Sequence, residues 1–228
     1  PSHQFPTGIV MPVRRRQELL QWACRREGRF LIEDDYDSEF RYKGKPVPAL
    51  QGMGREDKVI YLGTFSQSIA AAIRISYMVL PPALLELYRE RAGFYASTVS
   101  RIDQNILYQF LVRGHFERHL NRMRSVYREK HDSLLAALSP LGDGFQVSGE
   151  YAGLHLLLTH REMPERELVR LAEEAGVGVY GLSSYFIGEP EKGEGSRTVI
   201  LGYASLTAEE IRGGAEGLVQ AWGSCRKR

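Results

Sequence analysis

Three short apolar segments of the chain each end in carboxylates, hydroxyl groups or prolines, and this repeated pattern restricts the fold more than any other feature. "RFLIEDDYD" at 29–37 ends in carboxylates, "KVIYLGTFS" at 58–66 ends in hydroxyl groups, and "RISYMVLPP" at 74–82 ends in two prolines. Each has the length and composition of a β-strand, and a helical pattern at 13–28 precedes the first. Strands that alternate with helices predict an α/β fold in layers, with the loops near the strand ends.

The region from Pro82 to about Leu138 carries a helical pattern that is too long for one helix of a globular protein. Gly93 and Gly114 lie within it, and we expect the helix to break near both. A turn cluster, "PLGDG", follows this region, and two further strand–helix units follow the turn. These later elements predict a second, smaller α+β domain after a long helical connector.

The composition excludes several classes of protein. The chain has 228 residues, of which 43% are apolar and 25% charged, as in an ordinary globular protein that can bury a sizeable core. Its formal net charge of +2 gives no strong field for nucleic acid. Cys24 and Cys225 lie far apart and lack the spacing of a metal site, so we expect neither a disulfide scaffold nor bound zinc, and a reducing cytoplasm fits best.

The sequence shows no pattern of a membrane span or of a signal peptide. No apolar stretch has the length of a membrane span, and the N-terminus lacks the basic-then-apolar pattern of a signal peptide. The opening, "PSHQFPTGIVMP", reads like a loop that enters a helix in mid-domain. We therefore expect the sequence to be a piece of a longer protein.

Polar residues at the strand ends form the candidate site. Asp34 and Tyr36 follow the first strand, Thr64 and Ser66 follow the second, and Arg74 stands at the start of the third. Ligands of α/β sheets bind just beyond the carboxyl ends of strands, where such side chains would converge. Hydroxyl and guanidinium groups donate hydrogen bonds to phosphate, a carboxylate pairs with a protonated ring nitrogen, and a phenol donates to a ring oxygen. The set therefore suits a phosphate ester that carries a nitrogen-containing ring.

Each of these residue types also has a simpler explanation. Asp34 and Tyr36 alone would fit an acidic turn after a strand, and Arg74 would fit a surface ion pair. The hydroxyl residues at 64–68 would fit a helix N-cap, which is compatible with phosphate binding because a helix N-terminus attracts anions. Two other groups are expected to be solvated and not to bind metal: the carboxylates Glu33, Asp35, Asp37 and Glu39, and the histidines His115 and His119.

Four motifs together resemble the aminotransferase-like domain of the MocR/GabR-type bacterial transcription regulators: "PSHQFPTG", "LIEDDYDSEF", "VIYLGTFSQS" and "RISYMVLP". The resemblance covers almost the whole chain and implies the fold of type I pyridoxal 5′-phosphate (PLP) enzymes. It implies that residues 1–110 form the remainder of the large PLP-binding domain with the start of the interdomain helix. Residues 111–228 would then form the small C-terminal α+β domain.

The resemblance also implies partners. Regulators of this family carry an N-terminal winged helix-turn-helix that binds DNA, and their aminotransferase-like domain binds PLP and dimerises. We therefore expect a cytoplasmic homodimer that binds PLP and an amine or amino-acid effector. DNA would be bound only through the winged helix-turn-helix, which these residues do not include.

The family pattern assigns a role to each residue of the candidate site. Asp34 matches the aspartate that pairs with the pyridine nitrogen, and Tyr36 matches the tyrosine that bonds the ring hydroxyl. Thr64, Ser66 and Arg74 match the phosphate-binding set.

Two positions depart from the family pattern. Gln67 stands where the family has the lysine that forms a Schiff base with PLP. The nitrogen lone pair of an amide is delocalised into the carbonyl, so Gln67 cannot form that bond, and we expect non-covalent PLP binding at most and no catalytic residue. Both a deliberate lysine-to-glutamine exchange and a natural loss account for it. Ser205, in "GYASL", replaces the arginine that holds an effector carboxylate, which removes that contact for an amino-acid effector.

Three functions remain open from these residues. The first is the effector-binding and dimerisation domain of a PLP-responsive regulator, which is not an enzyme. The second is a fragment of a class I/II aminotransferase that was inactivated at its lysine. The third is a domain that serves only in assembly. The Asp-x-Tyr spacing of Asp34 and Tyr36 favours the regulator, and the retention of both residues with Arg74 favours cofactor binding.

Overall fold

The computed structural model describes residues 2–42, 44–45, 47–54, 57–188 and 196–223, and these form two compact units. Cys225 and residues 189–195 of the polar loop lie outside the described residues. The expectation that the chain has no disulfide therefore stays a prediction. The division predicted between residues 110 and 111 also stays a prediction. The first unit comprises Pro1–His3, Val10–Glu39 and Lys45–Met123, and the second comprises Gln4–Ile9, Phe40–Gly44 and Arg124–Arg228.

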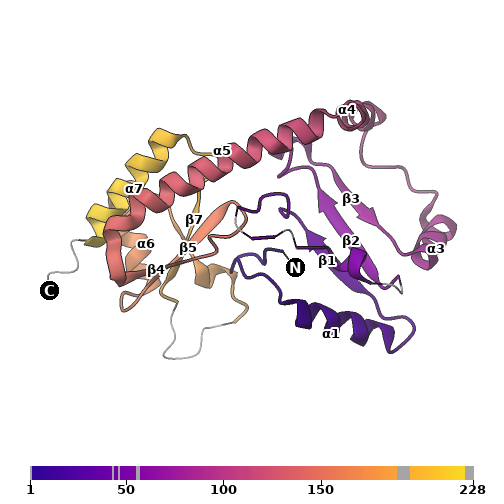
Figure 1. The fold of residues 1–228 in the computed structure, drawn as a ribbon, viewed down its shortest axis with the longest axis horizontal. Coiled ribbons are helices and arrows are strands. Elements are labelled where there is room, and N and C mark those ends of the chain that lie inside the picture. The colour runs from indigo at the N-terminus through magenta and orange to yellow at the C-terminus, as the bar shows by residue number, and fades with distance from the viewer. Residues whose placement is uncertain (1, 43, 46, 55–56, 189–195, 224–228) are drawn as a thin grey trace. The chain divides into compact units, whose positions relative to one another are not determined.

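The first unit is built on a three-stranded sheet in the order β1-β2-β3 (Figure 1). The strands are β1 (Leu31–Asp35), β2 (Val59–Thr64) and β3 (Ser76–Val79), as the sequence predicted. β1 and β2 are parallel, with Asp35 opposite Gly63. β3 is antiparallel to β2, with Ser76 opposite Thr64. The last residues of β1 and β2 and the first residue of β3 therefore lie at the same end of the sheet.

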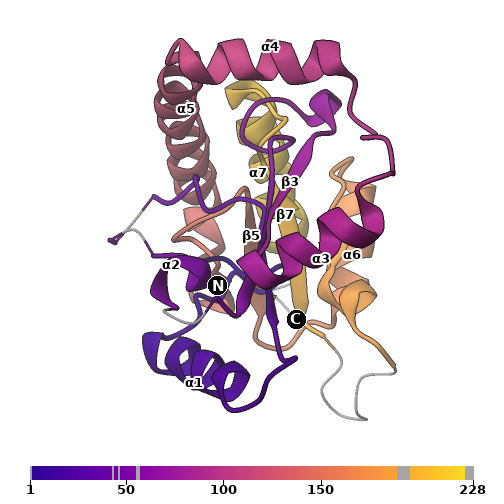
Figure 2. The ribbon, with the colours of Figure 1, turned by 90° about the vertical axis from the view of Figure 1, so that its right-hand side faces the viewer.

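The predicted breaks in the long helical region are confirmed at both glycines. Gly93 caps the end of α3 (Pro82–Ala92). Gly114 separates α4 (Arg101–Val112) from α5 (His115–Leu138), and its φ of +69° lies in the left-handed region that glycine adopts most easily. Figure 2 shows α4 lying across the start of α5, where the rings of Phe110 and Phe116 pack edge to face. The helices up to this point are α1 (Val13–Cys24), α2 (Leu50–Met53), η1 (Ala71–Ile73), α3 (Pro82–Ala92), α4 (Arg101–Val112) and α5 (His115–Leu138), which continues into the second unit.

The second unit contains a four-stranded antiparallel sheet in the order β4-β5-β7-β6. The predicted α+β arrangement is thus present in the described residues of this unit, although the unit is not the smaller of the two. Its strands are β4 (Phe145–Ser148), β5 (His155–His160), β6 (Tyr180–Gly181) and β7 (Thr198–Gly202). Its helices after α5 are η2 (Ser139–Gly144), α6 (Glu165–Glu174), η3 (Leu182–Tyr185) and α7 (Ala208–Gly223).

The core of the second unit lies between the central strands and the two last helices. Leu156, Leu158 and Val199 are fully buried on β5 and β7, which explains why these strands have almost continuous apolar sequences. On α7 the indole Nε1 of Trp222 donates a hydrogen bond to the Leu168 carbonyl of α6 at 3.0 Å. This bond satisfies the polar atom of a side chain that is 2% exposed and ties the two helices together.

A capping box starts the last helix. The Glu210 N–H donates to Thr207 Oγ1 at 3.2 Å, and the Thr207 N–H donates to Glu210 Oε2 at 2.7 Å. The sequence "TAEE" therefore specifies where α7 begins, because both bonds satisfy backbone donors that a helix start leaves unpaired.

Among the described residues, no helix combines the length and the apolar character that crossing a bilayer requires.

The substitution Leu158→Ala should lower the free energy of unfolding by about 2–5 kcal/mol, because Leu158 is fully buried and its removal leaves a cavity. Denaturant unfolding followed by circular dichroism measures the loss. Ile102→Ala, at a side chain that is 73% exposed, is the matched control and should cost less than about 0.5 kcal/mol. Equal losses at the two positions would contradict the assignment of the core.

Candidate functional site

The six residues of the predicted site come from one end of the first unit's sheet. Asp34 lies on β1, and Tyr36 follows directly after its last residue. Thr64 ends β2, where it is opposite Ser76, two residues after Arg74. Ser66 and Gln67 lie in the turn that follows β2. The parallel register thus brings these chain segments to one end of the sheet.

The six residues differ in how exposed their side chains are and in whether these side chains already make hydrogen bonds. Asp34, Gln67 and Arg74 are exposed, and within the described residues their side chains make no hydrogen bond. Tyr36, Thr64 and Ser66 are half-buried.

The hydroxyl of Thr64 organises the loop that follows β2. Thr64 Oγ1 donates to the Ile75 carbonyl at 3.3 Å and accepts from the Ser66 N–H at 3.1 Å. The Phe65 N–H donates to the same carbonyl at 2.9 Å. No α-helix begins here, since the turn leads only into the three-residue η1, so the expected N-cap is replaced by a local turn. The Thr64 proton is used within the loop, and Ser66 is the better hydroxyl donor for a ligand.

Arg74 has an unusual backbone. Its φ of 48° and ψ of 35° place a non-glycine residue in the left-handed region, immediately after η1. This conformation costs about 1 kcal/mol for an L-residue. Such outliers are concentrated where a function requires a particular side-chain position.

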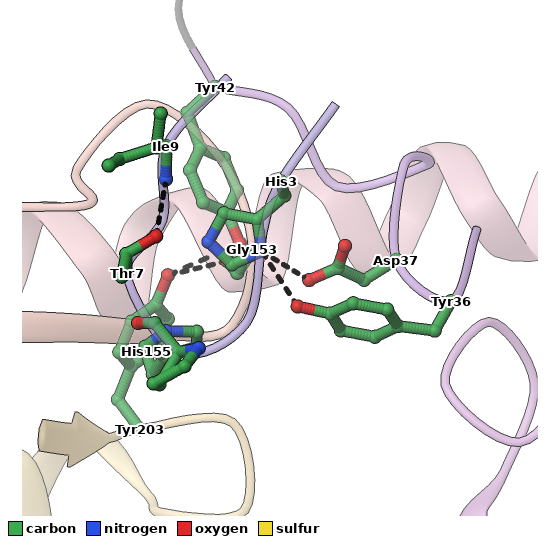
Figure 3. Close-up of polar contacts among 10 residues, drawn as sticks. His3, Thr7, Ile9, Tyr36, Asp37, Tyr42, Gly153, His155 and Tyr203 are labelled. Atoms are coloured by element: carbon green, nitrogen blue, oxygen red, sulfur yellow. Dashed lines mark hydrogen bonds and ion pairs between the residues drawn. The ribbon is translucent and has the colours of Figure 1, made fainter. Parts of the chain in front are cut away.

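A cluster of three side chains, two of them buried, lies beside the end of β1 (Figure 3). His3 Nδ1 is 2.7 Å from Asp37 Oδ2 and 3.2 Å from the Tyr36 hydroxyl. The side chains of His3 and Asp37 are 0% and 4% exposed. Burial, and next the negative charge of Asp37, raise the pKa of the Tyr36 phenol far above its usual value. Tyr36 therefore stays protonated and can donate a hydrogen bond at any physiological pH.

A second phenol–carboxylate pair lies between β1 and β2. Tyr61 donates to Asp35 Oδ2 at 2.7 Å, and Ser38 donates to the same oxygen at 2.8 Å. Burial, and then the bond to Asp35, raise the pKa of Tyr61. The ring of Tyr77 lies over Gly63, where a Cβ would come within 2.3 Å of the ring. A side chain at Gly63 would therefore have to displace the ring of Tyr77.

The expectation of a solvated acidic loop is wrong for two of its four carboxylates. Glu33 is 2% exposed and accepts from the backbone N–H groups of Leu50 and Gln51 at 2.7 and 3.0 Å, which stabilises the start of α2. Asp37 is 3% exposed and is paired with His3. The expected lack of a metal site stays a prediction; the structure's described residues contain no group of three or more metal-ligating side chains.

Sequence reasoning missed His3 and Asp37 as parts of the site. His3 lies within "PSHQFPTG", a motif that we used only for the resemblance, and its partners lie 33 and 34 residues away. The one available signal was the histidine itself, followed by a buried strand that ends in acids and a tyrosine.

The sequence profile of the family described as aminotransferase class I and II matches residues 2–218. The chain therefore belongs to the aminotransferase class I and II family. The fold expected from the motifs, that of the type I PLP-dependent transferases, is confirmed.

Within this family the chain is similar to transcription regulators, which confirms the resemblance to the MocR type. It is 43% identical over 224 residues to the uncharacterized HTH-type transcriptional regulator YhdI of Bacillus subtilis, covering 97% of this chain and 47% of the relative. It is 34% identical over 224 residues to the probable rhizopine catabolism regulatory protein MocR of Rhizobium meliloti, covering 97% and 44%. The chain thus spans about half the length of these relatives.

A solved structure of an enzyme is also similar. The crystal structure of LysN, the α-aminoadipate aminotransferase of Thermus thermophilus, complexed with N-(5′-phosphopyridoxyl)-L-leucine, matches with a TM-score of 0.79 at 30% identity. The match covers 98% of this chain and 57% of that chain. The fold is therefore shared between regulators and aminotransferases, and the function must be argued from the site.

The free energy of unfolding should fall as the pH rises above about 10, where the phenols of the unfolded chain ionise. The folded-state pKa values of Tyr36 and Tyr61 are raised, so the stability that these groups contribute is fully present below pH 10 and is lost as the pH rises toward the folded values. Denaturant unfolding between pH 9 and about 11.5 measures the slope. The Tyr36→Phe/Tyr61→Phe variant should lose stability less steeply, whereas Tyr180→Phe, at a tyrosine that is 68% exposed, should keep the original slope. Equal slopes in all three chains would contradict the burial of the two phenols.

Proposed function

We propose that this chain is the effector-binding and dimerisation part of a PLP-responsive transcription regulator and does not turn over a substrate. The single observation that carries the proposal is that Gln67, which has no amine, stands in the "GTFSQS" turn after β2, where the family resemblance places the Schiff-base lysine. The likeness to HTH-type regulators over 97% of the chain supports the regulatory class. We infer from the family resemblance that the complete protein acts in the cytoplasm as a homodimer and contacts DNA through an N-terminal winged helix-turn-helix.

The chemistry of the exposed side chains fits PLP. Asp34 offers a carboxylate for the pyridine nitrogen, and Tyr36 offers a protonated phenol for the ring oxygen. Ser66 and Arg74 offer donors to the phosphate, and the left-handed backbone of Arg74 supports a functional role for that residue. Thr64 is the weakest member of the set, because its proton already bonds the Ile75 carbonyl.

Gln67 decides between sensing and turnover. PLP, when bound to a lysine, supplies an electron sink for reactions of amino acids. An amide at this position supplies neither the nucleophile for covalent capture nor an efficient base for proton transfer. In this chain Gln67 can only donate or accept a hydrogen bond, so PLP or a PLP–amine adduct is held by non-covalent contacts.

Ligand binding would regulate by favouring one arrangement of the complete dimer over another. A ligand shifts a conformational equilibrium only through different affinities for the two states. The effector is an amine or amino acid, and Ser205 does not supply the arginine contact by which relatives of this type hold a carboxylate. An effector without an α-carboxylate is therefore favoured.

The second candidate is a fragment of an aminotransferase that was inactivated at its lysine. The likeness to the α-aminoadipate aminotransferase of Thermus thermophilus, at 30% identity, is the observation that favours it. The two candidates differ in what the restored lysine would do.

The substitution Gln67→Lys should restore covalent capture of PLP. Incubation with PLP, reduction with borohydride and mass spectrometry should give one added phosphopyridoxyl group on Lys at this position, and none on the unchanged chain, which should bind PLP reversibly in equilibrium dialysis. Gln17→Lys, at an exposed glutamine of α1, is the matched control for adventitious labelling of a surface lysine.

Two outcomes would contradict the proposal. If the unchanged chain and the Gln67→Lys chain both fail to bind PLP while folded, the sensing function is wrong and a role in assembly alone stands. If the Gln67→Lys chain converts an amino acid and a keto acid through many turnovers, the aminotransferase candidate stands instead.

A further inference from the structure

We propose that His3 and Asp37 are positioning residues, which hold the Tyr36 hydroxyl in place as a hydrogen-bond donor to the 3-oxygen of bound PLP. The inference deepens the proposed function and rests on it. The sequence alone indicates no role in ligand binding for any residue of "PSHQFPTG", and it predicts that Asp37 is solvated.

The first step is the burial of the His3–Asp37 pair. Both side chains are almost completely buried within the first unit, 34 residues apart in sequence and 2.7 Å apart in space (Figure 3). Burying a carboxylate is costly unless it is hydrogen-bonded, so such a pair is retained where it serves a purpose. The Tyr36 hydroxyl lies 3.2 Å from His3 Nδ1, just beyond the end of β1, and is the group that the pair holds in place.

The second step is to assign the proton that lies between His3 and Asp37. An ionised carboxylate can only accept hydrogen bonds, so the 2.7 Å contact requires the Nδ1 of His3 to carry the proton and donate it to Asp37. An Nδ1 that carries a proton has no lone pair to accept from Tyr36. The phenol therefore keeps its own proton for another acceptor, and its oxygen lies beside the N–H of His3.

The third step is the freedom that remains to Tyr36. The hydroxyl oxygen of Tyr36 lies 3.2 Å from His3 Nδ1, whose proton points to Asp37. Rotation about the bond from the ring to the hydroxyl oxygen redirects the phenol proton without moving the oxygen. A ligand oxygen can then receive the proton, while His3, itself fixed by Asp37, keeps the phenol oxygen where it is.

Other phenols near the strand end are less suited to this task. Tyr61 is committed to Asp35 at 2.7 Å, and the ring of Tyr77 is held against Gly63. Of these three phenols, Tyr36 is the one whose oxygen lies beside a buried histidine.

Two probes test the inference: PLP and 3-deoxypyridoxal 5′-phosphate, which lacks the acceptor oxygen. Equilibrium dialysis gives the dissociation constant of each for the unchanged chain, Tyr36→Phe, His3→Leu and the double variant. Each single substitution should weaken PLP binding about tenfold, as expected for one lost hydrogen bond to a ligand. The double variant should bind PLP no more weakly than Tyr36→Phe, because both changes remove the same bond. Binding of the 3-deoxy probe should be the same in all four chains.

Two further variants separate positioning from general structural support. His3→Asn places an amide N–H near the position of Nδ1 and should keep PLP binding within about twofold of the unchanged chain. His131→Leu removes a histidine of the second unit that is 1% exposed and hydrogen-bonded to Asp132, and it should change neither dissociation constant. Thermal unfolding checks that each variant is folded. If His3→Leu does not fold, His3→Gln replaces it, because its amide lies farther out than Nδ1 and should give the same tenfold loss.

The results that overturn the inference differ from those that overturn the proposed function. If a folded His3→Leu or His3→Gln chain binds PLP as tightly as the unchanged chain, or loses affinity for both probes alike, His3 does not position Tyr36 and PLP sensing stands. If the unchanged chain binds neither probe, the proposed function falls and the inference falls with it.

Discussion

The parallel pairing of β1 with β2 is the constraint on which the rest of the candidate site depends. Five residue pairs, from Leu31 opposite Val59 to Asp35 opposite Gly63, align the ends of the two strands. Side chains alternate between the faces of a strand, so a slip of one residue would bury Asp34 and expose Glu33. The exposed carboxylate that suits a ring nitrogen and the buried carboxylate that caps α2 are thus two results of one register.

The acidic segment from Glu33 to Asp37, at the end of β1, illustrates how neighbouring residues of one type acquire different chemistry. Glu33 accepts hydrogen bonds from backbone N–H groups, Asp35 from two hydroxyls, and Asp37 from a histidine, while Asp34 remains exposed. The three engaged carboxylates hold the segment in one conformation. The fourth is thereby presented on a rigid support, which is the condition for recognition of a small ligand.

Much of the fold could be predicted from local patterns, whereas the buried polar contacts could not. The strands, the helix breaks at Gly93 and Gly114 and the start of α7 follow from residues that are close in sequence. The burial of Glu33 and Asp37 depends on partners 17 and 34 residues away, and a run of acids read alone predicts a solvated loop. Gly63 likewise looks like a turn residue until the ring of Tyr77 is found against it. The predicted identity of the site rests on four motifs taken together, since each residue alone has a simpler explanation.

The route of the chain between the two units has a consequence for any attempt to divide the protein. The chain passes from one unit to the other after His3, Ile9, Glu39, Gly44 and Met123. The short segments carry contacts that the second unit needs: the Pro6 carbonyl accepts from His155, and Tyr42 donates to the Gly153 carbonyl. A polypeptide that begins at Arg124 would therefore lack both bonds, and no single cut within α5 yields two complete units, because Gln4–Ile9 and Phe40–Gly44 stay with the N-terminal piece. The two units are interleaved in sequence, so a fragment that spans one complete unit also carries segments of the other.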